Sequence, residues 1–590
     1  MLAEFERVAQ RGVPEATLVE EKAVLLRGLE AAADEALARP SAAYADEYVE
    51  HFLTGHGTLL SPVQKLALGR AMLPAITSAV LAQAAQQLVT TTAGERIFVQ
   101  LPRFSHVRPP TRESVLALVD SVHHAAIPAE SVLVQGTSPL LPQLPTPGHI
   151  TRERRDKVSG ITEWTLSNGA RVILKPTGND PDEVLIRAWS PGGFSCMPDT
   201  LFFTPGRMVA RLMTEAAGLG NHNRDALKRQ LATTGLRDFR VHIGYADESI
   251  DLAGSPRDLR TLFQLLYLQF TMPNLDTAAI HSWASLARYQ GPEVTLQNQL
   301  ELTFARGDPR LLPITTDLAD LVRPDQAMAV YRNRFGNAGN FTFTIVGAIT
   351  PQEARPLVER YVASLPATGE HEVPMPVDLK PFLPKVDFTF RNLELPRALT
   401  TIVFDGPFPS SPDGYLQARR ELDALLIVLR DRIRVRIREQ LGGSYSPSID
   451  GVTYGLPQVG QPDEHYRVVG GFVSAPGRMR ELWTEFRTIL DSARAKEATP
   501  AELTRAATIL RRQHETALQD NAYWLNTIGL YNRLGISLDK IIDPYGTTAL
   551  TPSEFRTAAQ RYLPNDVYIH LTAMPQDSTS YTRRDSTGSQ

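Results

Sequence analysis

The chain has 590 residues and a net charge of −4 at pH 7, with 43% hydrophobic and 21% charged residues. This ordinary globular composition excludes a general electrostatic affinity for nucleic acid or for an anionic membrane surface. The single cysteine, Cys196, excludes an internal disulfide and a cysteine-based metal cluster.

The length is too great for one hydrophobic core, and at roughly 150 residues per domain it predicts three or four domains. No apolar run reaches the roughly 20 residues that a membrane-spanning helix needs, so no membrane span is predicted. The first residues, MLAEFERVAQRG, are polar and amphipathic and lack the apolar core of a signal peptide. The cellular compartment is therefore left open.

Two kinds of unit recur along the chain. The first is a helix, a short break, a proline at the first turn of a new helix, and then a long amphipathic helix. It occupies residues 4–29, with Pro14, and residues 486–513, with Pro500. The second unit is a helix followed by a β-rich strand. It occurs at residues 72–102, 318–347 and 548–573.

The complete copies of this pattern open with strands. Residues 161–176 read as two strands around an Asn168-Gly169 turn, the dipeptide that two-residue hairpin turns prefer. Residues 386–406 have the same character. Strands come first as hairpins, helices follow, and a last helix and strand close the unit. This order predicts an α+β fold in which each domain is an antiparallel or mixed sheet with helices on one face.

The repeats also predict the domain layout. The first copy has its closing half but no opening half, so we expect it to be the C-terminal half of an incomplete second α+β domain. The predicted boundaries are residues 1–103 for this half-domain, 104–155 for an inter-half linker with a helix from Thr111 to His124, 156–372 and 382–575 for two complete domains, and 576–590 for a disordered tail.

The stretch from Arg430 to Pro447 carries the most chemistry. A helix with one apolar face is predicted to end at Gly442-Gly443, with Arg438 in its last turn and Tyr445 just after it. A guanidinium and a phenol on rigid supports can bind a peptide carbonyl or stabilise an oxyanion formed from it. The alternative is a structural role. Arg438 would then be one of the cations that stabilise the C-terminal end of a helix, and Tyr445 would be a residue at the edge of the core. The apolar face consists of Leu422, Leu425, Leu426, Leu429, Ile433, Ile437 and Leu441.

The string REQLGGSYSPS around Arg438 and Tyr445 resembles the signature in the C-terminal half of the pitrilysin/insulinase family of zinc metallopeptidases, which includes the mitochondrial processing peptidases. The stretch from Ala517 to Leu525 is similar to one that follows this signature in the family. The resemblance covers about residues 1–575. It implies four homologous α+β domains in two halves, which are joined by a hinge and close around a peptide.

The family's zinc site is an H-x-x-E-H motif on a helix of the first domain, with a more distant glutamate as third ligand. The nearest string here, Glu47-Tyr48-Val49-Glu50-His51, has a glutamate in place of the first histidine. The equivalent helix of the third domain, Val209 to Glu215, has no pair of ligands. We therefore expect the zinc-binding first domain to be missing and no metal to be bound by this chain.

The resemblance thus implies the C-terminal, substrate-binding part of a zinc-dependent metalloendopeptidase, which supplies Arg438 and Tyr445 and is inactive alone. The expected partners are peptide substrates and either the missing N-terminal half or a zinc-bearing partner subunit. Two alternatives stay open: a non-catalytic subunit of a heteromeric processing peptidase, and a structural family member. A periplasmic or secreted location of the parent protein is an expectation from the resemblance alone.

Overall fold

The structure of this chain is a computed structural model. It describes residues 2–34, 36, 41–55, 59–90, 97–98, 110–125, 127, 139–197, 207–232, 234–290, 296–306, 308, 311, 323–378, 386–393, 397–544, 546 and 549–575. The predicted strand at the end of residues 72–102 and the predicted tail 576–590 lie outside or mostly outside these residues.

The chain forms two compact units, each described here by itself. Unit 1 consists of residues 1–139 and 226–235, and its described elements are helices. Within it α1 packs on α5 and α6, and α2 packs on α4. The helices are α1 (Leu2–Arg11), α2 (Glu15–Asp34), α3 (Ser41–Thr54), α4 (Pro62–Met72), α5 (Ser78–Thr90), α6 (Arg112–His123) and, largely within this unit, α9 (Arg224–Ala232).

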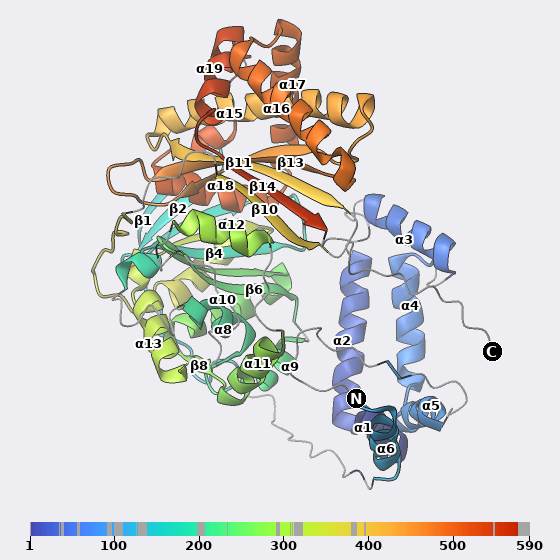
Figure 1. The fold of residues 1–590 in the computed structure, drawn as a ribbon. Coiled ribbons are helices and arrows are strands. Elements are labelled where there is room, and N and C mark those ends of the chain that lie inside the picture. Colours follow the sequence, from blue (N-terminus) through green and yellow to red (C-terminus); the bar gives the residue numbers. More distant parts are fainter. Residues whose placement is uncertain are drawn as a thin grey trace, which may run out of the picture. The chain divides into compact units, whose positions relative to one another are not determined.

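Unit 2 consists of residues 140–225 and 236–590 and contains two large sheets (Figure 1). The first has seven strands in the order β1-β2-β3-β9-β4-β7-β6. β1 lies within the range predicted as a linker and pairs with β2. The strands are β1 (Ile150–Arg155), β2 (Thr162–Leu166), β3 (Arg171–Pro176), β4 (Val184–Pro191), β6 (Leu236–Ile243), β7 (Asp247–Gly254) and β9 (Thr342–Gly347), and a separate pair joins β5 (Ala217–Leu219) to β8 (Pro273–Leu275).

The second sheet has five strands in the order β10-β14-β11-β13-β12. This order and its strand directions repeat the inner part of the first sheet, β3-β9-β4-β7-β6, including one parallel pair at β3–β9 and one at β10–β14. The predicted α+β class with mixed sheets is therefore confirmed. The strands are β10 (Val386–Leu393), β11 (Ala398–Phe408), β12 (Ser448–Gly455), β13 (Glu464–Ser474) and β14 (Ile569–Pro575).

Helices follow the strands in the same order in both halves of unit 2. The first half has α8 (Arg207–Glu215), α10 (Leu259–Thr271), α11 (Thr277–Gln290), α12 (Leu296–Ala305), α13 (Pro324–Phe335) and α14 (Pro351–Leu357). The second half has α15 (Pro412–Ile433), α16 (Met479–Ala495), α17 (Pro500–Ala517), α18 (Asn521–Leu534) and α19 (Pro552–Tyr562).

Local sequence signals explain where several of these elements begin and turn. Thr499 and Thr551 cap α17 and α19 through capping boxes with glutamates three residues later, and a proline follows each threonine directly. The predicted Asn168-Gly169 turn joins β2 to β3, and Gly169 has a φ of +86°, which glycine adopts without strain. The predicted hairpin and helix starts are confirmed.

Each sheet buries one face against its own helices. In the first half, Phe270 of α10 contacts Phe341 and Phe343 edge-to-face or tilted, with ring centroids 4.9 and 5.8 Å apart. In the second half, Leu422, Leu425 and Leu429 of α15 are fully buried among residues of α16, α17 and α19. The opposite face of each sheet is left for other contacts.

The opposite face of the seven-stranded sheet receives α18, a helix that follows the second sheet in sequence. The side-chain amide of Asn521, which is 2% exposed, accepts a hydrogen bond from the Thr177 hydroxyl at 2.6 Å and donates one to Glu183 at 3.0 Å. Lys175 lies 4.2 Å from the ring centre of Trp524. The stretch from Ala517 to Leu525, which resembles a stretch in the family named above, therefore connects the two halves of unit 2 through side-chain contacts.

Replacing Asn521 with alanine should lower the free energy of unfolding by about 1–3 kcal/mol, because the half-buried Thr177 and Glu183 would lose their shared partner. Urea unfolding followed by circular dichroism measures the change. Asn179→Ala, which removes an exposed hydrogen bond to the Leu518 carbonyl, is the matched control and should cost less than about 0.5 kcal/mol. Equal losses in the two variants would contradict this role of Asn521.

In the first half, α12 has the position in the chain order that α18 has in the second half. It lies against the sheet of the second half (Figure 1). The ring centre of Phe304 on α12 lies 3.4 Å from the guanidinium carbon of Arg467 on β13. Burial lowers the pKa of Arg306, which follows α12, while the charge of Asp405 on β11 acts in the opposite direction. Each half of unit 2 thus places a helix on the sheet of the other.

No single helix in the described part of the chain is both long and apolar enough to cross a bilayer. By length and composition alone, one helix pair, residues 62–75 with 78–88, passes the same test with a bend of 94° between its members.

Candidate functional site

The helix that leads to the candidate site runs along the core of the second half. Leu422, Leu425, Leu429, Ile433 and Ile437 are fully buried, as the periodicity of the sequence predicts. From Arg434 to Gln440 the α-helix continues as a π-helix, a wider turn that the sequence pattern did not predict. Such turns occur frequently at functional sites. Arg438 lies within this π-helix.

Four of the five arginines between residues 430 and 438 are neutralised by carboxylates. The hydrogen bond from Arg432 is the largest cause that lowers the pKa of Glu502 to about 2, so this pair stays ionised at ordinary pH. Arg430 also donates to the carbonyl of Ile449 on the edge strand β12 at 2.9 Å. The pairs are Arg430–Asp450, Arg432–Glu502, Arg434 with Asp431 and Glu439, and Arg436–Glu485.

Arg438 differs from these four arginines. Among the described residues its interaction partner is the ring of Tyr445, whose centre lies 4.5 Å from the guanidinium carbon. Both side chains are exposed, and Tyr445 has 79% of its surface accessible. The geometry brings together the two residues that the sequence singled out, and it leaves the N–H groups of Arg438 and the phenol of Tyr445 facing solvent.

The loop between the two residues is held firmly. Gly442 has a φ of +57°, and its N–H donates to the carbonyl of Arg438 at 3.2 Å. Arg478, at the start of α16, donates to the carbonyl of Leu441 at 3.1 Å. A methyl group on Gly443 would lie 2.3 Å from the buried Leu482 side chain of α16, so any larger residue here would require that side chain to move. The loop therefore presents Tyr445 on a fixed backbone.

Two residues of this loop environment were missed by the sequence analysis. Arg478 lies 40 residues after Arg438 and carries no local signal for its contact with Leu441. Ser444 is 7% exposed, and its hydroxyl is buried without a hydrogen-bond partner among the described residues. Only the packing of the loop on α16 reveals these contacts.

The residues present do not fit a zinc site. On α8, Val209, Leu212 and Met213 are buried and Arg211 pairs with Glu215, so this helix offers no pair of ligands. On α3, Glu47, which stands where the first histidine of the motif would be, pairs with Lys65. In the part of the chain that the structure describes, no group of three or more histidine, cysteine, aspartate or glutamate residues could hold a metal ion. The arrangement at Arg438 and Tyr445 can donate hydrogen bonds, and it offers no ligands to a metal.

Known proteins resemble this chain over most of its length. A family model described as "Peptidase M16 inactive domain" matches residues 322–510, which include Arg438 and Tyr445. The "Zinc protease PQQL-like" of Arabidopsis thaliana is 24% identical over 602 residues, which cover 97% of this chain and 59% of the relative. The chain thus spans about three fifths of the length of this curated relative.

Solved structures share the fold. The periplasmic protease PqqL from Escherichia coli matches with a TM-score of 0.58 and 20% identity, over 97% of this chain and 62% of that one. The ferredoxin protease FusC, in complex with Arabidopsis ferredoxin, matches with a TM-score of 0.63 and 16% identity, over 98% of this chain and 62% of that one. At these identities the likeness concerns the fold.

Proposed function

The chain belongs to the pitrilysin/insulinase family of peptidases, also named peptidase M16, and from this premise we propose that it is the C-terminal, substrate-binding part of a zinc-dependent metalloendopeptidase. In this role Arg438 and Tyr445 bind the peptide at the bond to be cleaved. The zinc site lies on another domain, carried either by a longer form of the same polypeptide or by a partner subunit.

One observation carries this proposal. Of the five arginines from Arg430 to Arg438, four are paired with carboxylates, and Arg438 is stacked on an exposed tyrosine ring. An arginine that only stabilised the end of the helix would gain by pairing with a carboxylate, as its neighbours do. An exposed cation–π pair contributes only about 0.5–1 kcal/mol. This small gain points to a role outside folding, and the fixed loop between the two residues supports it.

The chemistry of the pair suits a peptide carbonyl. The guanidinium has N–H donors in a rigid plane and stays protonated at all physiological pH values. The phenol adds one O–H donor from the neighbouring loop. When a carbonyl is attacked, its oxygen gains negative charge, and donors already in place stabilise that charge without reorganisation. Arg438 and Tyr445 would bind the carbonyl in the ground state and bind the oxyanion more strongly.

The alternative of a non-catalytic subunit that supplies the same two residues in trans rests on the same observation, because an exposed pair serves a partner chain as well as its own. A purely structural family member is less favoured, since a scaffold has no use for an arginine and a tyrosine presented to solvent.

Metal analysis tests the proposal. The purified chain should contain far less than one zinc per molecule and should not cleave peptides by itself. Co-expression of the chain with a zinc-bearing first domain should produce peptide hydrolysis that a chelator abolishes. One zinc per molecule, or chelator-sensitive cleavage by the chain alone, would contradict the assignment of the metal site to another domain.

A further inference from the structure

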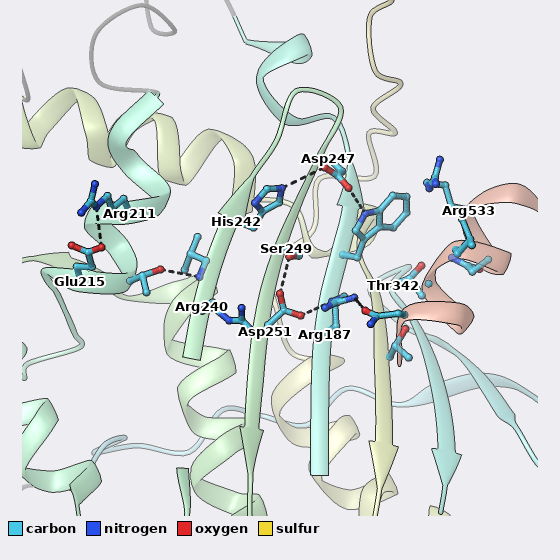
Figure 2. A pocket seen from close by; sticks show the side chains of 18 residues that line it. Arg187, Arg211, Glu215, Arg240, His242, Asp247, Ser249, Asp251, Thr342 and Arg533 are labelled. Carbon is cyan, nitrogen blue, oxygen red and sulfur yellow. Dashed lines mark hydrogen bonds and ion pairs between the residues drawn. The ribbon is translucent and has the colours of Figure 1, made fainter. Parts of the chain in front are cut away.

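A cavity of about 590 Å³ opens on the face of the seven-stranded sheet that α18 only partly covers. Figure 2 shows its floor, formed by β6, β7, β4 and β9, with Arg211 and Glu215 of α8 beyond one edge and Arg533 of α18 at the other. The volume lies within the range of about 300–1,000 Å³ that is usual for ligand sites. The cavity lies between the sheet of the first half of unit 2 and α18, and neither Arg438 nor Tyr445 lines it.

The charges around the cavity are balanced within the protein. Trp189 donates its indole N–H to Asp247 at 3.0 Å, and Ser249 donates to Asp251 at 3.1 Å. Each of the cavity's four arginines already has a carboxylate partner, so an anionic ligand would have to displace one of these carboxylates. The pairs are Arg187–Asp251, Arg211–Glu215, Arg240–Asp238 and Arg533–Glu464.

Neutral polar groups on the cavity floor have unused hydrogen-bonding capacity. Thr342 and Thr344 line the cavity and are 8% and 3% exposed, and neither hydroxyl has a hydrogen-bond partner among the described residues. Asn526 also lines the cavity, and its side-chain oxygen accepts a hydrogen bond from Arg187 at 2.8 Å. The two threonine hydroxyls are open to the cavity, so a ligand there can bond to them without breaking a bond within the protein.

We propose that this cavity is a second peptide-binding site, which takes an uncharged polar stretch of the substrate away from the cleaved bond. The choice of a peptide as the ligand rests on the proposed function. Hydroxyl and amide side chains match the N–H and C=O groups of an extended main chain, and Trp189 and Leu530 provide apolar walls for small side chains. The site would hold part of a long substrate while Arg438 and Tyr445 engage another part.

Gly529 on α18 allows a direct test. It lines the cavity, and a methyl group at this position would meet no atom within 4 Å. Gly529→Leu should therefore place a branched side chain in part of the cavity, and the loss of a glycine from a helix should raise the melting temperature. Gly529→Ala is the matched control, because it makes the same helix change and leaves most of the cavity open.

The probe is a fluorescein-labelled octapeptide of alanine, serine and glutamine with both ends blocked, and fluorescence anisotropy measures its binding to the full chain. We expect binding that Gly529→Leu weakens at least tenfold, that Thr344→Val weakens severalfold, and that Gly529→Ala leaves within twofold of the parent. Binding should persist in Arg438→Ala, which separates this site from the proposed catalytic one.

Equal peptide binding by Gly529→Leu and the parent would overturn the inference, as would the absence of peptide binding by the parent. A neutral sugar, maltotetraose, serves as the competing ligand class. If Gly529→Leu abolished binding of maltotetraose while the peptide did not bind, the cavity would be a carbohydrate site and the inference would be wrong. If Arg438→Ala lost hydrolysis but still bound the peptide, the loss would be a result about the proposed function, and the cavity would remain a separate peptide-binding site.

Discussion

Under the proposed function, replacing Arg438 with alanine should lower the peptide turnover of this chain, combined with a zinc-bearing domain, by about 10²–10³-fold, which is the usual effect of removing one donor to a developing oxyanion. Tyr445→Phe, which removes only the phenolic O–H, should have an effect of the same kind. Stability should fall by no more than about 1 kcal/mol in Arg438→Ala, which loses the exposed cation–π pair, and by less than about 0.5 kcal/mol in Tyr445→Phe, which keeps the ring. Turnover is measured with a quenched fluorescent peptide, and stability by urea unfolding of this chain alone.

Arg434→Ala is the control for this prediction. Arg434 lies on the same π-helix, is 49% exposed in its side chain, and pairs with Asp431 and Glu439. It should therefore keep full turnover. If Arg438→Ala and Tyr445→Phe instead unfolded far more easily than the parent while turnover stayed unchanged, Arg438 would be a helix-capping residue and the proposed function would lose its support.

A second large effect is expected at Glu248, a fully buried carboxyl in the first half of unit 2. It accepts a hydrogen bond from the Gly193 N–H at 2.6 Å, and its other oxygen has no partner among the described residues. Arg334 lies 3.9 Å away but makes two shorter hydrogen bonds to Glu372, at 2.8 and 2.9 Å. Burial raises the pKa of Glu248 from 4.5 to about 8, and the charge of Arg334 only partly opposes this.

The direction of the pH dependence follows from this pKa. Between pH 4.5 and about 8 the folded chain keeps a proton on Glu248 that the unfolded chain has lost. The contribution of Glu248 to stability therefore falls as pH rises through this range, by roughly 5 kcal/mol in total, and is constant above it. Glu248→Gln should remove this loss, so the variant should be clearly more stable than the parent at pH 9 and nearly equal to it at pH 4.5.

Urea unfolding of the parent and of Glu248→Gln between pH 4.5 and 9 measures this difference. Glu372→Gln serves as the comparison, since it weakens the partner of buried Arg334 and should destabilise the chain at high pH instead of stabilising it. A parent-minus-variant difference that did not change with pH would show that Glu248 is ionised throughout and that its burial is compensated by Arg334.

Local features of this protein could be predicted well from sequence because each depends on residues that are near one another in the chain. The hairpin at Asn168-Gly169, the capped starts at Thr499 and Thr551, and the apolar face of α15 follow from turn chemistry and periodicity. The proximity of Arg438 and Tyr445 followed from the same rules. The π-helix did not, because a helical period of three to four residues does not reveal where the hydrogen bonding changes by one residue.

Contacts between distant segments could not be predicted in this way. Thr177 and Asn521 are 344 residues apart, and no property of either residue indicates its partner. Burial of Glu248 depends on a strand, a helix and a loop that come together only in the fold. The cavity likewise requires four strands and a helix from both halves. The sequence supplied the residues of these sites, whereas tertiary packing determined which of them meet.

The mutual placement of α12 and α18 has a consequence for how such proteins can diversify. A sheet taken alone from either half would lose the helix that lies on its second face, and with it partners such as Asn521 or Phe304. A chimera that exchanged one half with a relative would break both contacts at once. The unit that recombination can exchange is therefore the pair of halves. Relatives with the same fold should differ more readily in their loops and cavities than in the contacts between these two halves.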